Sequence, residues 1–226
     1  MARYQFNWTP IWENRNLIFE GFLTTIGLSS IALILALLVG AIIGTLAASR
    51  SRILRTATGL YVECMRNVPL LIHMYVWYMA LAYLRLPAFT CAVLGLTLYS
   101  SAYVAEVVRA GIGSVPRGQS QAAMATGLSR MQAHVLVIYP QALRVIAPSL
   151  ASLSSQLIKD SSLASVIAVA ELTYQAGAIE GQTFRTFEIY ITIALLYLAL
   201  VVVVSQLLMF LSGSRSPAII GRVADA

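Results

Sequence analysis

The sequence contains few charged residues and few cysteines, and these shortages exclude whole classes of protein. Only 11% of its 226 residues are charged, whereas 59% are hydrophobic and the mean hydropathy is +0.80. Soluble domains carry roughly 25% charged residues, so a water-soluble globule is excluded. The two cysteines, Cys64 and Cys91, fall in or beside apolar runs without metal-ligand spacing. We interpret both as buried thiols.

Recognisable catalytic motifs are missing as well. His73 and His134 are the only histidines; we interpret the first as a packed histidine and the second as an exposed one. No serine or cysteine stands in a nucleophile motif, there is no H-E-x-x-H, and there is no GxxxxGK[ST] phosphate loop. We therefore expect no catalytic residue, no metal site and no ATPase activity in this chain.

Long apolar runs dominate what is present. The run from Gly21 to Ser49 contains no charge and exceeds the ~20 residues that cross a bilayer. No internal repeat and no linker is visible, so we predict one all-α, multi-pass membrane domain over residues 1–226. The five predicted spans are about 20–49, 58–84, 86–112, 144–170 and 188–212, with a loop at about 113–140.

Arginine distribution predicts the orientation of these spans. With five spans, eight basic residues fall on one side and four on the other. The first group comprises Arg50, Arg52, Arg55, Arg117, Arg130, Arg144, Arg215 and Arg222; the second comprises Arg3, Arg15, Arg85 and Arg185. Because cytoplasmic loops are enriched in Lys and Arg, we predict an outside N-terminus, a cytoplasmic C-terminus and a cytoplasmic 113–140 loop. This bias accounts for the net charge of +6 without nucleic acid.

The predicted loop begins with "PRGQSQAAMATGLS", which is small, polar and interrupted by glycine. Pro116 suits the first turn of a helix, and Gly127 suits the left-handed position after its end. Ser129 and Gln132 match a capping box that starts a second helix, which we expect to end near Tyr139-Pro140. The alanine-lined first helix would allow another protein to approach its backbone closely, although a plain interspan loop remains an alternative.

Two E-x-x-R pairs stand near the predicted cytoplasmic ends of the second and third spans. Glu63 with Arg66, and Glu106 with Arg109, have the i,i+3 spacing that places both charges on one helical face. Unpaired charge inside a bilayer is costly, so we predict two ion pairs. They either orient the spans near the headgroups, form part of an inner gate or brace the loop at 113–140.

The fourth predicted span is unusually polar, with Lys159-Asp160 among many serines. Adjacent helical residues point about 100° apart, so at least one of these charges should face water or another span. Pro69 and Pro148 interrupt hydrogen bonding in the second and fourth spans and by default set packing angles. We assign the fourth span to a translocation pathway; a polar packing seam is the alternative. The candidate pathway residues are Lys159, Asp160, Ser161, Ser162 and Glu171, the last expected to face the outer side.

These segments together resemble a known family. "GQSQAAMATGLS" followed by "VIYPQALR" resembles the EAA motif of bacterial ABC importer permeases. "AYVAEVVRAGIGSVPRGQ", "RNVPLL" and "LIKDSSLASVIAVAELTYQAG" are similar to the polar amino-acid uptake branch (histidine/glutamine/glutamate-aspartate type), in family order from Tyr61 to Gly177. The resemblance implies the type I ABC importer permease fold with five spans.

The resemblance also implies a coupling helix that fits a cleft of a separate ATP-binding subunit. Its implied contact residues are Gln119, Gln121, Ala122, Ala123, Thr126 and Gly127. The chain departs from the family where Gln121 replaces the usual Glu and Thr126 replaces a commonly aliphatic residue. An amide keeps hydrogen bonding but loses the charge, so a salt bridge to the ATPase is not expected at Gln121.

Further implications concern partners and location. The resemblance implies ATP-binding cassette ATPase subunits that hold ATP and Mg, a periplasmic amino-acid-binding protein, and the bacterial inner membrane with its lipid. Five spans form a thin wall around a solute, so we expect a second permease copy or paralogue. The cargo would be a polar amino acid, with glutamate and aspartate as candidates. A stand-alone secondary transporter or channel remains the alternative, although no inverted repeat is visible.

Overall fold

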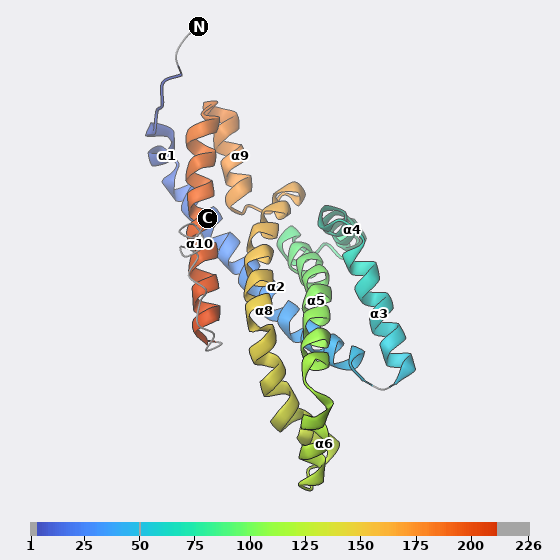
Figure 1. The fold of residues 1–226 in the computed structure, drawn as a ribbon. Helices are drawn as coiled ribbons and strands as arrows, with labels where there is room; N and C mark the ends of the chain where they lie inside the picture. The colour runs from blue at the N-terminus through green and yellow to red at the C-terminus, as the bar shows by residue number, and fades with distance from the viewer. Residues whose placement is uncertain (1–3, 50, 212–226) are drawn as a thin grey trace. The chain divides into compact units, whose positions relative to one another are not determined.

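The computed structural model describes residues 4–49 and 51–211, and within them all regular secondary structure is helical (Figure 1). The helices are α1 (Thr9–Glu13), α2 (Arg15–Ala47), α3 (Arg52–Arg66), α4 (Leu70–Ala82), α5 (Ala88–Ser114), α6 (Arg117–Ala125), α7 (Arg130–Ala133), the π-helix η1 (His134–Ile138), α8 (Tyr139–Asp160), the 3₁₀-helix η2 (Ser161–Ile167), α9 (Leu172–Thr183) and α10 (Thr186–Leu211). Arg3, Arg50, Arg215 and Arg222, which entered the orientation prediction, lie outside the described residues.

Four of these helical segments are long and apolar enough to cross a membrane. They are Arg15–Ala47, Ala88–Ser114, Arg130–Ile167 and Thr186–Phe210. Each corresponds to one of the first, third, fourth and fifth predicted spans. The prediction of an all-helical membrane protein is thereby confirmed.

The second predicted span, over 58–84, consists of two helices that meet near Pro69, where we expected the hydrogen bonding to be interrupted. Helix α3 ends at Arg66 and α4 begins at Leu70, with Pro69 as its N-cap. Pro69 has no N–H to continue the hydrogen-bond ladder of α3, and it restricts the residue before it to extended conformations. At 13 residues, α4 is about 20 Å long, which is shorter than a bilayer core of about 30 Å.

The helix after the capping box does not end near Pro140, contrary to our expectation. Helix α7 passes through the π-helical turns of η1 directly into α8, and Pro140 is the second residue of α8. The missing N–H of a proline is tolerated in a first helical turn, and wider π-helical turns often accompany bends. Pro148 lies inside α8, as predicted, and η2 ends where Ala168 has a positive φ of 61°.

The chain forms two compact units, each discontinuous in sequence. The first comprises residues up to Leu35, Val68–Tyr99 and Gln156–Val202; the second comprises Ala36–Asn67, Ser100–Ser155 and residues from Val203 onward. In the first unit, α9 packs against α10 and the start of α2 through Leu172, Ile189 and Ile18. Thr25 Oγ1 accepts a buried hydrogen bond from the Leu172 N–H at 3.1 Å, which ties α2 to the start of α9.

In the second unit, α2 and α5 meet at two glycines. A Cβ on Gly40 would lie 2.7 Å from the Ser101 carbonyl oxygen, and one on Gly44 would lie 2.5 Å from that of Ala105. The backbones are therefore in direct contact, as in small-xxx-small helix pairs of membrane proteins.

The lone cysteines and histidines are placed mostly as predicted. His73 is buried, His134 is exposed and Cys91 is buried. Cys64 is exposed on α3, so its interpretation as a buried thiol is wrong. It follows Glu63 on the polar side of a strongly amphipathic helix whose apolar side buries Val62.

Candidate docking loop and polar span

Helix α6 and the turn that ends it are determined by local sequence. Pro116 is the N-cap of α6, one position before the first turn where we expected it. Gly127 has a φ of +91°, which favours glycine strongly. The N–H of Leu128 donates to the Ala123 carbonyl at 3.3 Å and that of Gly127 donates to the Met124 carbonyl at 3.1 Å. This pair of bonds is the Schellman motif.

The predicted capping box follows immediately. Ser129 Oγ accepts from the Gln132 N–H at 3.3 Å, and Gln132 Oε1 accepts from the Ser129 N–H at 2.9 Å. Two unpaired N–H groups at the start of α7 are thereby satisfied. The helix–turn–helix geometry of this loop is stabilised at both ends of the turn by short-range hydrogen bonds.

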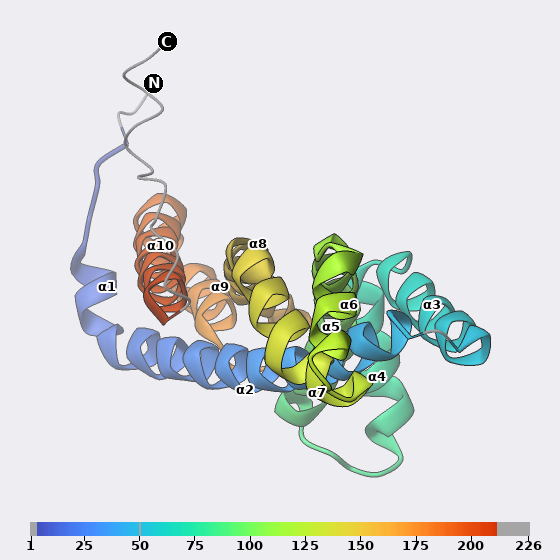
Figure 2. The same ribbon diagram turned by 60° about the horizontal axis from the view of Figure 1, so that its bottom comes forward.

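Most of the implied coupling residues are presented to solvent. Gln119, Gln121, Ala122, Thr126 and Gly127 are exposed, whereas Ala123 is the buried residue of α6. Figure 2 shows α6 beside α7 and the start of α8, which the two helices' contacts with each other and with η1 support. Exposed small residues on an end-capped helix form a rigid surface that a partner can approach closely.

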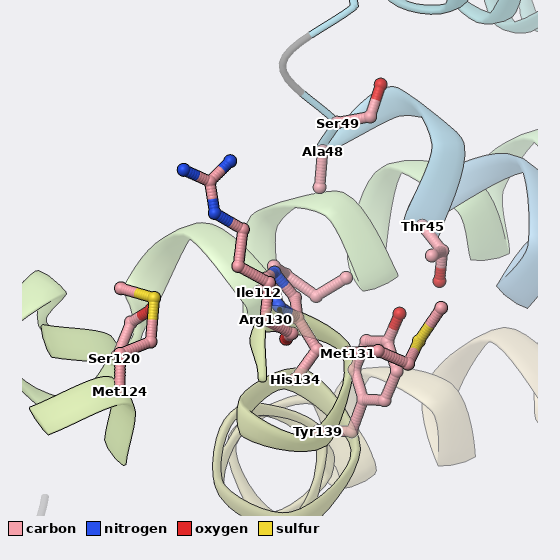
Figure 3. Close-up of a pocket in the computed structure, with 10 residues that line it drawn as sticks. All are labelled: Thr45, Ala48, Ser49, Ile112, Ser120, Met124, Arg130, Met131, His134 and Tyr139. Atoms are coloured by element: carbon pink, nitrogen blue, oxygen red, sulfur yellow. Dashed lines mark hydrogen bonds between the residues drawn. The ribbon is translucent and has the colours of Figure 1, made fainter. Parts of the chain in front are cut away.

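A cavity of about 610 Å³ lies beside this surface (Figure 3). It is lined by Thr45, Ala48, Ser49, Ile112, Ser120, Met124, Arg130, Met131, His134 and Tyr139. Figure 3 shows Thr45 of α2 and Met131 of α7 approaching one another across it. Within the described residues, the buried Ser49 Oγ has no hydrogen-bond partner. The lining thus includes two flexible methionine side chains and this unpartnered hydroxyl.

The charged residues of the loop all carry positive charge. No Asp or Glu occurs in the sequence between Glu106 and Asp160, whereas α6 begins with Arg117 and α7 begins with Arg130. Gln121, which occupies the usual Glu position, adds no negative charge. The charged side chains of this loop are therefore all cationic.

The polar residues of the fourth span lie at the junction of α8 and η2. Lys159 and Ser162 line a cavity of about 600 Å³ with Thr173, Tyr190, Ile193, Ala194, Tyr197, Leu198 and Val201. Asp160 and Ser161 are not among its lining residues: Asp160 Oδ1 accepts from Gln156 Nε2 at 2.8 Å, and Ser161 is fully buried. Ser161 and Ser162 Oγ each donate to a carbonyl three residues earlier at 2.7 Å. The serines are thus partly occupied with their own backbone.

Glu171 is the N-cap of α9. Its side chain is fully buried; Oε1 accepts from the Tyr174 N–H at 2.8 Å, and Oε2 accepts from Tyr197 Oη at 2.6 Å. Burial raises the pKa of the Glu171 carboxyl, while these hydrogen bonds lower it to a smaller extent. Tyr197 connects this carboxyl to the Lys159 cavity, which it also lines.

All four residues of the predicted E-x-x-R pairs line one further cavity, of about 350 Å³. Glu106 and Arg109 form an ion pair. Glu63 and Arg66 lie within the described residues but do not pair with each other; the Arg66 guanidinium lies 5.0 Å from the centre of the Tyr103 ring. Aromatic faces attract cations, and this stacking replaces the expected second pair. Arg55 also lines the cavity, which spacing alone could not indicate.

Some structural residues of the site escaped the sequence analysis. Gly40 and Gly44 bring α2 against α5, and their GxxxG spacing is a signal that could have found them. Tyr61 Oη lies 2.7 Å from Ser101 Oγ and connects α3 to α5. No sequence pattern marks that pair.

Comparison with known proteins gives consistent matches. Residues 36–215 match the family described as "Binding-protein-dependent transport system inner membrane component". The chain is 36% identical over 201 residues to the probable glutamine ABC transporter permease protein GlnM of Bacillus subtilis, covering 88% of this chain and 93% of that protein. It is 37% identical over 195 residues to the glutamate/aspartate import permease protein GltJ of Escherichia coli, covering 80% and 79%.

Solved structures agree. The structure superimposes on one described as an amino acid ABC transporter with histidines, with a TM-score of 0.83 and 34% identity, covering 93% of this chain and 99% of that one. The MetNI methionine ABC transporter shares the fold at 18% identity, with a TM-score of 0.78 over 89% and 97% of the two chains. The chain therefore has the type I ABC importer permease fold and belongs to the family of binding-protein-dependent transport system inner membrane components.

Proposed function

We propose that this chain is the membrane-spanning permease of an ATP-driven importer of polar amino acids in the bacterial inner membrane. The observation that carries the proposal is the α6 loop: an exposed helix, a Schellman turn and a capping box between two membrane-crossing segments of a matched permease. Relatives named as glutamine and glutamate/aspartate permeases support that substrate class. Within it, glutamate and aspartate are our first candidates.

Energy would come from a separate ATPase that holds ATP and Mg and contacts α6. Gln119, Gln121, Ala122, Thr126 and Gly127 are exposed for this contact, while Ala123 supports it from below. Because the loop is cationic and lacks the usual Glu, the facing cleft would be neutral or acidic. Movement of α6 would pass into the spans through α5 and through the continuous α7–η1–α8 segment.

The topology that fits this role has five crossings, an outside N-terminus and a cytoplasmic C-terminus. In it, α3 and α4 together provide the second crossing that neither provides alone. The arginine excess on the side of the α6 loop supports this arrangement. A binding protein would dock on the opposite side, and a second permease copy or paralogue would complete the wall around the solute.

Within the permease, Lys159 and Ser162 would face the translocation pathway through the cavity that they line. An ammonium group there suits a substrate carboxylate. Asp160, Ser161 and Glu171 would support this surface from behind. Glu63, Arg66, Glu106 and Arg109 would act around their shared cavity as part of a gate.

The coupling role is tested with two alanine substitutions in the same loop. Gly127→Ala forces a side chain into a left-handed conformation, which costs about 1–2 kcal/mol. Gly118→Ala, in α6, meets nothing within 4 Å and serves as the matched control. Gly127→Asn should retain function, because Asn tolerates positive φ.

The readouts are membrane insertion, co-purification with the ATPase, and stimulated ATP hydrolysis alongside uptake in proteoliposomes. We expect Gly127→Ala to insert normally but to lose coupled hydrolysis, with Gly118→Ala unchanged. Equal coupling in all three variants would contradict the assignment of α6.

A further inference from the structure

The segment before the first helix is held against the start of α10. Tyr4 Oη donates to the Glu188 carboxylate, and the Asn7 N–H donates to Glu188 Oε1 at 2.7 Å. Arg185 Nη1 donates to the Gln5 carbonyl at 2.9 Å. Three contacts between residues about 180 positions apart hold a non-helical stretch in one place. We call residues Tyr4–Trp8 the N-terminal latch.

The Glu188 carboxylate accepts two of the hydrogen bonds that hold this segment. Its side chain is fully buried in the first turn of α10, with Arg185 Nη1 3.8 Å away. A buried carboxylate is costly unless hydrogen bonds and charges compensate it. The latch supplies two of those hydrogen bonds. Release of the latch would therefore expose the Glu188 carboxylate to solvent or leave it buried without these donors.

The latch carries aromatic rings that the chain itself does not cover. Together with neighbouring residues they form what we call the aromatic patch: Tyr4, Phe6, Trp8, Trp12, Phe184 and Phe187, exposed by 47% to 81%. Several of its rings touch. Tyr4 contacts Phe6 and Phe187 edge-on with centroids 5.2 and 5.3 Å apart, and Phe6 stacks on Trp8 at 6.2 Å.

The aromatic patch lies at the ends of two apolar helices that are long enough to cross a membrane. Two membrane-crossing helices, α2 and α10, begin at Arg15 and Thr186, within a few residues of it. Arg15 lies 5.5 Å from the Trp12 ring centre and Arg185 lies 6.0 Å from that of Tyr4. Rings with a polar edge are enriched where hydrocarbon meets headgroups, and guanidinium groups there can bind phosphate.

We propose that the aromatic patch lies in the phospholipid headgroup layer of one leaflet, and that the bond to Glu188 holds it at that depth. The latch thus anchors the first and last spans together at the membrane surface. The partner is the lipid headgroup layer, in contrast to a binding protein or a second permease copy, either of which would shield the rings from lipid. The inference needs only membrane insertion and stands apart from the transport role.

Tryptophan fluorescence of the full chain in phospholipid nanodiscs tests this. Trp8, Trp12 and Trp77 are the three tryptophans, so Trp12→Phe with Trp77→Phe leaves Trp8 as the only reporter. We expect lipids brominated near the headgroup to quench Trp8 more than lipids brominated deep in the chains, and aqueous acrylamide to quench it weakly. A matched chain that retains only Trp77, on α4, is the control.

Tyr4→Phe then tests the latch, because it removes one hydroxyl and keeps the ring. We expect red-shifted Trp8 emission and stronger acrylamide quenching, with Trp77 unchanged. Quenching of Trp8 by acrylamide alone in the parent chain would overturn lipid contact. Protection from both quenchers would indicate a covering protein and would overturn it equally, and an unchanged Tyr4→Phe spectrum would overturn the role of the Glu188 bond.

Discussion

The contact of α2 with α5 gives a sharply defined prediction for Gly44→Ala. An added Cβ would lie 2.5 Å from the Ala105 carbonyl oxygen and 2.8 Å from Val108 Cβ. Backbone atoms cannot rotate away as a flexible side chain can, so the helices must separate. Gly40→Ala meets the same kind of obstacle, with the Ser101 carbonyl oxygen at 2.7 Å.

Two opposing terms determine the size of the effect. Ala is more favourable than Gly inside a helix by roughly 0.5–1 kcal/mol, whereas overpacking costs typically about 1–3 kcal/mol. Because a backbone atom cannot be moved aside by rotation of a side chain, we expect Gly44→Ala to lower the free energy of unfolding by about 1–2 kcal/mol net. Gly27→Ala, on the same helix with nothing within 4 Å, should instead gain up to about 1 kcal/mol.

Thermal unfolding in detergent, followed by size-exclusion fluorescence, measures the difference. For a chain of this size about 1 kcal/mol shifts Tm by roughly 2–4 °C, so Gly44→Ala and Gly27→Ala, about 1–3 kcal/mol apart, should differ by about 2–12 °C in Tm. Uptake should fall with Gly44→Ala and persist with Gly27→Ala. Equal melting of the two variants, or a Gly44→Ala variant more stable than the parent, would refute the backbone contact.

Two further predictions concern buried and exposed charge. Burial raises the native pKa of the Glu171 carboxyl above the value of about 4.3 that it has in the unfolded chain. The protonated form therefore contributes to the free energy of unfolding, fully below the unfolded pKa. This contribution is lost as the pH rises through the native pKa. Glu171→Gln should therefore gain Tm relative to the parent with rising pH, and a pH-independent difference would contradict this. Arg109→Ala breaks a half-exposed ion pair and should change stability by less than about 1 kcal/mol, while uptake falls if the pair belongs to the gate. Unchanged uptake would leave Glu106–Arg109 a purely structural pair.

Local chemistry explains which predictions succeeded. The left-handed Gly127 and the Ser129–Gln132 capping box depend on bonds within a few residues, so short-range sequence was sufficient. Three of the four long spans followed from uncharged apolar runs that water cannot accommodate, and the fourth followed from a run that Lys159 and Asp160 interrupt. The ends of helices near prolines were harder, because Pro69 became the N-cap of a separate helix and Pro140 was absorbed into α8.

Composition and spacing by themselves determined that this chain is a helical membrane protein with an exposed, helix-capped loop, because hydrophobic run length and capping act locally. Only the tertiary structure decided which polar groups share a site. It buried Glu171 against Tyr197, paired Glu106 but not Glu63, and joined the N-terminal segment to Glu188. Those outcomes depend on which distant helices approach one another, and a carboxylate is satisfied by whichever donor the packing brings within reach.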